Sequence, residues 1–251
     1  MAQPQAEHRL RFPYNSQIAL AVWRALFFSP GAFEPDPSQK AQWNRGAYLV
    51  RGLGHCVACH SPRNVFGATS GKLELSGGLI PMQGWYAPSL TSAGEAGVAH
   101  WDTQHVVDLL KSGRSDRGSV MGPMAEVVYR STQYLSEEDL RAMAVFLKSL
   151  PGAGEEVTRD DRTASDQDPL FRRGARLYER ECAQCHGDKG EGAPGAYAAL
   201  AGNRAVTMDV PANLIRVVLS GGFLPATAGN PRPYGMPPYA HVMIPTEPRQ
   251  Q

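Results

Sequence analysis

Two C-x-x-C-H pentapeptides, at residues 56–60 and 182–186, contain every cysteine of the chain and constrain its fold more than any other feature. Two thiols three positions apart lie on one side of a helical turn, where both can add to the vinyl groups along one edge of a haem. The histidine that follows is then placed to bind the iron. The sequence therefore predicts two covalent haems c, attached through Cys56, Cys59, Cys182 and Cys185 and ligated by His60 and His186.

Two other uses of paired cysteines are less favoured. A zinc site would require pairs more than a hundred residues apart to converge, whereas structural zinc ligands usually lie closer in sequence. It would also leave the two matching histidines unexplained. A thioredoxin-like redox pair needs a βαβ setting, which the pattern around these motifs does not indicate.

The chain repeats itself once. Residues 45–49 precede the first pentapeptide as residues 173–178 precede the second. Further along, residues 105–113 match residues 213–221, and both segments have helical apolar spacing and end at a glycine, a common residue after a helix. Each of these two helical segments is followed by a segment that contains a methionine, and we expect both of the following segments to be loops.

These methionines are the candidates for the second axial ligand of each iron, because a thioether opposite histidine suits electron transfer. In the second copy, Met236 lies in a Pro-rich segment that cannot be helical, with Met208 and His241 as rivals. In the first copy, Met124 and Met121 are both candidates, and Met124 falls at the more similar distance after the repeated helix.

The pattern predicts a mostly α fold of two tandem class I cytochrome c-like haem domains with long loops. We expect an N-terminal arm or connector at 1–40, a first domain at 41–151, a linker at 152–168 and a second domain at 169–251. The first domain closes with a helix that Ser136 caps. The second has no such helix, because the segment after Met236 contains four prolines, so we expect it to be C-terminally incomplete.

Bulk properties exclude some functions. The formal net charge of the 251 residues is +1, which gives no strong electrostatic attraction to nucleic acid or to an acidic membrane.

No secretory signal is visible, and the apolar run from Ile18 to Phe28 is too short to span a bilayer. Because haem attachment of this kind takes place outside the cytoplasm, we expect a periplasmic protein whose N-terminus is incomplete or processed. The apolar face around Val22 is expected to pack on its own haem domain, and docking onto a missing domain or a catalytic subunit is the alternative.

The chain resembles a known family at several points. These are residues 43–50, 52–56, 59–64, 84–85, 87–91, 122–128, 131–133, 200–203 and 236–238. They are similar to the cytochrome c subunit of membrane-bound alcohol, aldehyde and gluconate-type dehydrogenases. That family usually carries three haem motifs, whereas this chain carries two, and residues 10–37 resemble the connector after the first haem domain. The first haem domain and the family's C-terminal helix are thus expected to be missing.

The resemblance implies Met124 and Met236 as axial ligands. It also implies a periplasm-facing subunit that takes electrons from a catalytic dehydrogenase subunit and passes them to quinone or a terminal oxidase. Nothing in the sequence resembles a flavin, quinone-cofactor or molybdenum site, so we expect an electron-transfer subunit and no catalysis by the chain alone. The alternative is a dihaem cytochrome c peroxidase-like enzyme in which one iron has an exchangeable sixth position.

Overall fold

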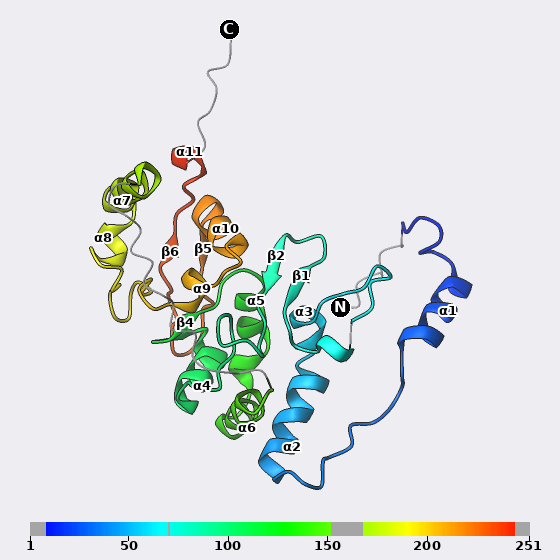
Figure 1. The fold of residues 1–251 in the computed structure, drawn as a ribbon. Helices are drawn as coiled ribbons and strands as arrows, with labels where there is room; N and C mark the ends of the chain where they lie inside the picture. Colours follow the sequence, from blue (N-terminus) through cyan, green and yellow to red (C-terminus); the bar gives the residue numbers. More distant parts are fainter. Residues whose placement is uncertain (1–8, 70, 152–167, 244–251) are drawn as a thin grey trace, which may run out of the picture.

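The computed structural model describes residues 9–69, 71–151 and 168–243, and within them the chain is mostly helical (Figure 1). This confirms the prediction of a mostly α fold. The expected linker at 152–168 lies outside the described residues except for Asp168, and residues 244–251 lie outside them entirely. In the described part, no helix combines the length and the apolar character needed to cross a bilayer.

The described residues form eleven α-helices. Their bounds are α1 (Gln17–Phe27), α2 (Ala41–Tyr48), α3 (Val57–His60), α4 (Thr103–Ser112), α5 (Pro123–Arg130), α6 (Glu137–Lys148), α7 (Pro169–Glu181), α8 (Ala183–His186), α9 (Arg204–Thr207), α10 (Ala212–Ser220) and α11 (Ala240–Met243). A π-helical turn, η1 (Leu49–Leu53), continues α2, and two 3-10 turns are η2 (Gly71–Leu73) and η3 (Thr132–Tyr134). The two repeated helices, α4 and α10, end at Gly113 and Gly221 as predicted.

Three short antiparallel ribbons connect the helices. They pair β1 (Gly78–Ile80) with β2 (Trp85–Ala87), β3 (Arg114–Ser115) with β4 (Gly118–Ser119), and β5 (Gly222–Phe223) with β6 (Gly235–Met236). Each strand has two or three residues. A lone two-stranded ribbon of this length has little stability of its own, so these ribbons serve to hold neighbouring loops together.

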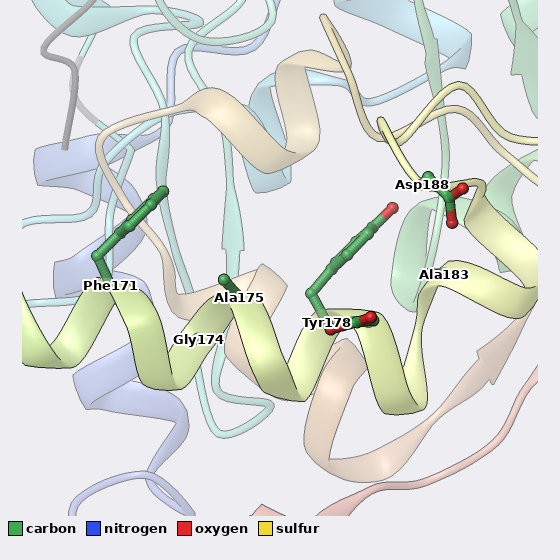
Figure 2. A pocket seen from close by; sticks show the side chains of 7 residues that line it. Phe171, Gly174, Ala175, Tyr178, Ala183 and Asp188 are labelled. Atoms are coloured by element: carbon green, nitrogen blue, oxygen red, sulfur yellow. The ribbon is translucent and has the colours of Figure 1, made fainter. Parts of the chain in front are cut away.

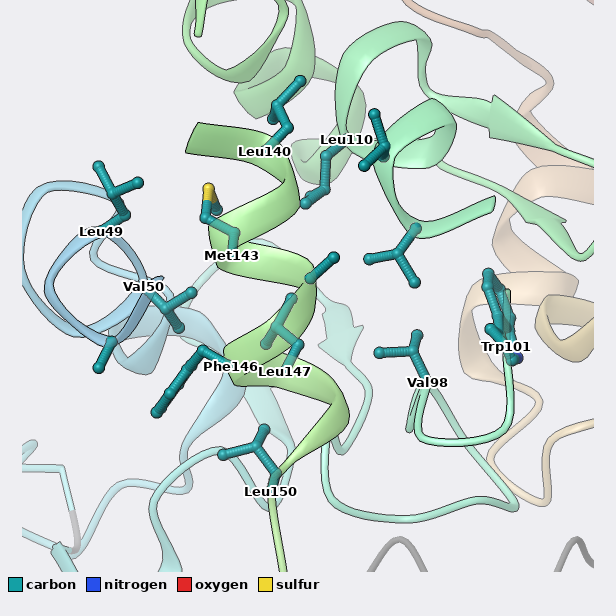
Figure 3. Close-up of a cluster of buried hydrophobic side chains, with 14 of the residues drawn as sticks. Leu49, Val50, Val98, Trp101, Leu110, Leu140, Met143, Phe146, Leu147 and Leu150 are labelled. Carbon is teal, nitrogen blue, oxygen red and sulfur yellow. The ribbon is translucent and has the colours of Figure 1, made fainter. Parts of the chain in front are cut away.

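The core lies in the first copy of the repeat, where α2 crosses α6 (Figure 3). The helices approach so closely at Gly46 that a Cβ there would lie 2.0 Å from the carbonyl oxygen of Ala142. Beside this crossing, the rings of Trp43 and Phe146 meet edge to face at 5.2 Å. Glycine at the crossing therefore allows α6 to pack directly on α2, where Gly46 and Ala47 are buried.

The sequence of α6 explains both its start and its packing. The side chain of Ser136 accepts a hydrogen bond from the Asp139 amide at 3.1 Å, so the predicted cap is present. Leu140, Met143 and Phe146 follow at helical spacing and are each at most 2% exposed. Met143 is thus a core residue.

The second copy is packed differently. Neither α7 nor α10 contains a buried residue, although both carry apolar side chains at helical spacing. Within residues 168–243, the buried apolar side chains are those of Met208, at 8% exposure, and Pro225. After Met236 the described chain forms only the four-residue helix α11, so no described element covers α7 as α6 covers α2.

The two copies contact each other through β2 and α10. The Asn213 side chain accepts a hydrogen bond from the Tyr86 amide at 2.9 Å and donates one to the Tyr86 carbonyl at 2.7 Å. Next to this pair, the Arg216 guanidinium lies over the Trp85 ring, 5.3 Å from its centroid. Because the Asn213 amide pairs with both the backbone N–H and the backbone carbonyl of Tyr86, it fixes the position of α10 relative to β2.

The arm helix α1 stands apart from the rest of the fold in Figure 1. It contains no buried residue and contacts the first copy at Phe66. The Trp23 indole donates a hydrogen bond to the Phe66 carbonyl at 2.9 Å, and the Phe27 ring stacks on the Phe66 ring. The predicted packing on its own haem domain is therefore limited to one loop, and most of its apolar face stays exposed.

Candidate haem-binding sites

Each C-x-x-C-H segment forms one helical turn. In the first copy the His60 amide donates to the Cys56 carbonyl at 2.9 Å, and in the second the His186 amide donates to the Cys182 carbonyl at 3.0 Å. The turns correspond to α3 and α8. This backbone places the two thiols of each motif, three positions apart, on one side of a helical turn, as covalent attachment to one haem edge requires.

His60 is held at two points. Its Nδ1 lies 2.7 Å from the Pro88 carbonyl oxygen, and its own carbonyl accepts a hydrogen bond from the Gly77 amide at 2.7 Å. Because a carbonyl only accepts, Nδ1 carries the proton and Nε2 keeps its lone pair for a metal. Burial lowers the pKa of His60, which favours the neutral ring that a ligand must have.

His186 repeats this arrangement in the second copy. Its Nδ1 lies 2.8 Å from the Ala198 carbonyl oxygen, and its own carbonyl accepts from the Gly192 amide at 2.7 Å. The same two contacts are therefore built from different loops in the two copies. Histidines whose Nδ1 donates to a backbone carbonyl are typical metal ligands through Nε2.

The cysteine thiols fit thioether attachment better than metal binding as thiolates. Burial raises the pKa of Cys56 to about 11, and burial is also the main reason that the pKa of Cys182 is raised. A zinc site would need thiolates, which these surroundings disfavour. Among the residues that the structure describes, no group of three or more His, Cys, Asp and Glu side chains is placed to hold a metal ion. The donor sets therefore fit haem c.

Met124 does not lie in a loop, contrary to the expectation. Pro123 occupies the first position of α5, and Met124 follows it in the first turn of the helix. The proline ring is compatible with a first helical turn, so the helix begins directly after Gly122. Met124 is half-buried against the core of the first copy.

Met121 faces the second copy. Its methyl group would lie 3.2 Å from a Cβ at Gly222, and it lines a cavity of about 420 Å³ between α5 and β5 together with Trp85 and Phe223. Of the two candidates in the first copy, Met124 is thus the one that packs against its own copy's core.

Met236 lies in β6 and is half-buried, paired with Gly222 of β5. The segment is non-helical as predicted, but it is a short strand where a loop was expected. Of its rivals, Met208 is buried directly after α9, and His241 is exposed in α11.

Sequence reasoning missed the backbone carbonyls that orient the histidines, because backbone groups carry no sequence signal of their own. It also missed two tyrosines of the second copy. The charge of the nearby Cys185 raises the pKa of Tyr197. The Tyr239 hydroxyl donates to the Glu181 carbonyl at 2.9 Å, beside Cys182.

A helical chain with two such motifs, each with a histidine fixed for metal binding, has the features of c-type cytochromes. A family model described as "Cytochrome C oxidase, cbb3-type, subunit III" matches residues 169–250. The matched segment contains α7, the second C-x-x-C-H turn and Met236.

Relatives with known names match most of the chain. The chain is 38% identical over 253 residues to the cytochrome c subunit of a quinone alcohol dehydrogenase from Gluconacetobacter polyoxogenes, covering 96% of this chain and 54% of the relative. It is 40% identical over 228 residues to a nicotinate dehydrogenase subunit from Pseudomonas putida, covering 90% of this chain and 19% of the relative. A protein named "Diheme cytochrome c-type" from Cereibacter sphaeroides is 39% identical over 146 residues, covering 57% and 47%.

These comparisons confirm the resemblance that the sequence predicts. The chain is homologous, at 32–40% identity over most of its length, to cytochrome subunits of alcohol, fructose and gluconate dehydrogenases and to a nicotinate dehydrogenase subunit. Homology to c-type cytochromes implies covalently bound haem c. Most of the names are those of cytochrome subunits, in agreement with an electron-transfer chain and not a catalytic one. The chain spans about half the length of the alcohol dehydrogenase relative.

Proposed function

We propose that the chain is a dihaem c-type cytochrome that carries electrons from a catalytic dehydrogenase subunit to the respiratory chain, with quinone or a terminal oxidase as acceptor. The observation that carries this proposal is the duplicated histidine arrangement, in which Nδ1 of His60 and of His186 contacts a backbone carbonyl at 2.7 and 2.8 Å. Both copies would therefore present Nε2 to an iron, so each would hold one haem.

The chemistry of each site is divided between cofactor and protein. A haem, when bound, supplies a one-electron redox centre. The cysteine pairs 56/59 and 182/185 would anchor it, and His60 and His186 would ligate the iron. Met124 and Met236 are the proposed second ligands, which would raise the potential relative to two histidines. We assign the haems to domains at 41–151 and 169–251, joined by a linker at 152–168.

The partner and compartment follow from the relatives. The alcohol dehydrogenase relative is by name a subunit of a larger enzyme, so a catalytic dehydrogenase subunit is the proposed electron donor. Covalent haem attachment favours the periplasmic side of the cell membrane.

The test uses the mature haem-containing chain. Mixed alone with ethanol, gluconate or an aldehyde, it should stay oxidised, and it should become reduced when a catalytic dehydrogenase subunit and that subunit's substrate are added together. Reduction by substrate without a partner subunit would contradict the proposal. A chain that no dehydrogenase subunit reduces, yet that dithionite reduces, would contradict the proposed donor.

A peroxidase-like enzyme is the second candidate, favoured by the more open second copy, in which α7 and α10 bury no residue. Such openness would suit an iron whose sixth position is exchangeable. Optical spectra distinguish the two functions. A carrier should show a methionine-to-iron charge-transfer band from both haems, whereas a high-spin haem that reacts with peroxide indicates the enzyme.

A further inference from the structure

The carbonyl that orients His60, its anchoring carbonyl, belongs to a peptide unit whose other end binds a carboxylate. Nδ1 of His60 lies 2.7 Å from the Pro88 oxygen. The N–H of the same Pro88–Ser89 peptide donates to Oε2 of Glu95 at 2.7 Å. Ser89 is buried, at 4% exposure, so the donor of this charged hydrogen bond is shielded from water. A continuous chain of contacts therefore joins the Glu95 carboxylate, through one peptide, to the ring of His60.

Glu95 is held in place by further contacts. The Tyr86 hydroxyl donates to the same carboxylate oxygen at 2.9 Å. Burial raises the pKa of Tyr86 to about 12, so this hydroxyl keeps its proton and can donate. The Glu95 amide donates to the Ser92 carbonyl at 3.1 Å, and the Ala96 amide donates to the Ser89 carbonyl at 2.9 Å. The loop thus fixes the carboxylate against the peptide that orients His60.

The second copy has the same framework without the carboxylate. Leu90 and Leu200 each follow their anchoring carbonyl by two positions, and their amides donate at 2.8 and 2.7 Å to equivalent backbone carbonyls. The amide of the anchoring peptide therefore belongs to Ser89 in the first copy and to Ala199 in the second. Within the described residues, no carboxylate accepts a hydrogen bond from the Ala199 amide, whereas Glu95 accepts one from Ser89.

The acidic side chains that follow the second motif lie elsewhere. Asp188 lines a cavity along α7 (Figure 2). Glu191 is exposed and accepts a hydrogen bond from the Lys189 amide at 2.8 Å. The two proposed iron ligands, His60 and His186, thus differ in the charge that lies behind their anchoring carbonyls.

We infer that Glu95 lowers the reduction potential of the first haem by acting through the Pro88–Ser89 peptide, an inference that rests on the proposed dihaem function. A carboxylate at the N–H end polarises the peptide and makes its carbonyl a stronger acceptor for the proton on Nδ1. A histidine held by a stronger acceptor is a more basic ligand, which favours ferric over ferrous iron. Because the second copy has no equivalent of Glu95, this charge biases an electron toward the haem at His186.

The test is a potentiometric titration of the mature haem-containing chain with chemical mediators, followed by visible absorption. Glu95→Gln keeps the size of the side chain and removes its charge, so it should raise one of the two potentials. We expect the equilibrium of that haem to shift about tenfold toward the reduced state, or ~59 mV for one electron. Glu191→Gln is the matched control and should leave both potentials nearly unchanged, because this exposed carboxylate does not bind an anchoring peptide.

Proton NMR of the reduced chain shows which histidine is affected. Glu95→Gln should move the signal of the proton on Nδ1 of His60 and leave the corresponding signal of His186 in place. A potential that changes while the His60 signal stays in place would contradict action through the peptide, because the charge would then act through space alone.

Tyr86→Phe separates action through the peptide from simple support of the loop. It leaves the charge unchanged and removes one of the two donors to Oε2, so the Ser89 amide should bind the carboxylate more strongly. The potential of the first haem should therefore fall, opposite to the effect of Glu95→Gln. A shift in the same direction in both variants would show that Glu95 only supports the loop.

Failure of the inference and failure of the proposed function give different results. A chain with no haem attached beside His60 contradicts both. Two haems whose potentials Glu95→Gln leaves unchanged contradict the inference alone, because the titration uses chemical mediators and no dehydrogenase.

Discussion

At the scale of single residues, His60 and His186 owe their orientation to backbone groups far from their own motifs. Each ring donates from Nδ1 to a carbonyl, of Pro88 in one case and of Ala198 in the other. Such a contact fixes the tautomer and ring plane of a ligating histidine before the metal binds. The motif therefore supplies the ligating histidine, and the loop that follows orients its ring.

The choice of axial methionine in the first copy is testable. Met124 packs on its own core, whereas Met121 lies near Gly222 of the second copy. Met124→Leu should remove the methionine-to-iron charge-transfer band of one haem, and Met121→Leu should leave both bands in place. The measurement is the absorption spectrum of the oxidised protein. Loss of the band in the Met121 variant alone would reverse the assignment.

Single residues also set the limit of sequence-based prediction. The spacing of cysteine and histidine predicts the two helical turns, since it depends on local geometry alone. The sequence does not predict the position of Met124 in the first turn of α5, because a Gly-Pro pair is compatible with a loop as well as with the start of a helix. The contact between Tyr86 and Asn213 was beyond prediction, because it joins residues 127 positions apart in sequence.

At the scale of elements, the two copies use the same type of helix in different surroundings. Gly46 allows α6 to cross α2, while Gly174 of α7 faces open space. The repeat in sequence predicts α2 and α7 equally well. It does not predict which of them is covered, because covering depends on a second helix distant along the chain.

Alanine at the two equivalent glycines should have opposite effects. Gly46→Ala forces the helices apart and should lower the free energy of unfolding by about 1–3 kcal/mol, a typical cost of overpacking. Gly174→Ala should be neutral or stabilise by up to ~1 kcal/mol, because alanine is the better helix former. Denaturant unfolding of both variants measures these changes. Equal destabilisation by both would contradict the packing described for α2 and α7.

The ion pair between α2 and α6 gives a prediction about pH. Hydrogen bonding to Arg45 lowers the pKa of Asp139, so the folded state binds its proton less tightly than the unfolded state. The pair therefore stabilises the fold above the ordinary aspartate pKa of about 4 and loses this effect as pH falls further. Asp139→Asn should reduce stability slightly at pH 7. The difference from the natural chain should vanish in acid, as unfolding midpoints across this range would show.

At the scale of the whole molecule, a small polar contact is one of those that join the two copies. Asn213 makes two hydrogen bonds to the backbone of Tyr86, and Arg216 lies over Trp85. This contact joins β2, which precedes the His60 anchor at Pro88, to α10 of the second copy. It therefore links the surroundings of one proposed haem to those of the other.

Removing that link should be visible at one amide. In Asn213→Ala the Tyr86 amide loses its acceptor, and its hydrogen exchange should accelerate several-fold, in line with ~1 kcal/mol for one hydrogen bond. The Gly77 amide, which donates to the His60 carbonyl at 2.7 Å, is the internal control and should keep its rate. Faster exchange at both amides would instead indicate general loosening of the first copy.

The most direct test of the whole account is the mass of the denatured protein after maturation with export and haem-attachment machinery. We predict the mass of the polypeptide plus two haems. The double variants Cys56→Ala/Cys59→Ala and Cys182→Ala/Cys185→Ala should each retain one. A natural chain that carries only one haem, or only the mass of its amino acids, would contradict the central claim that both motifs hold a covalent haem.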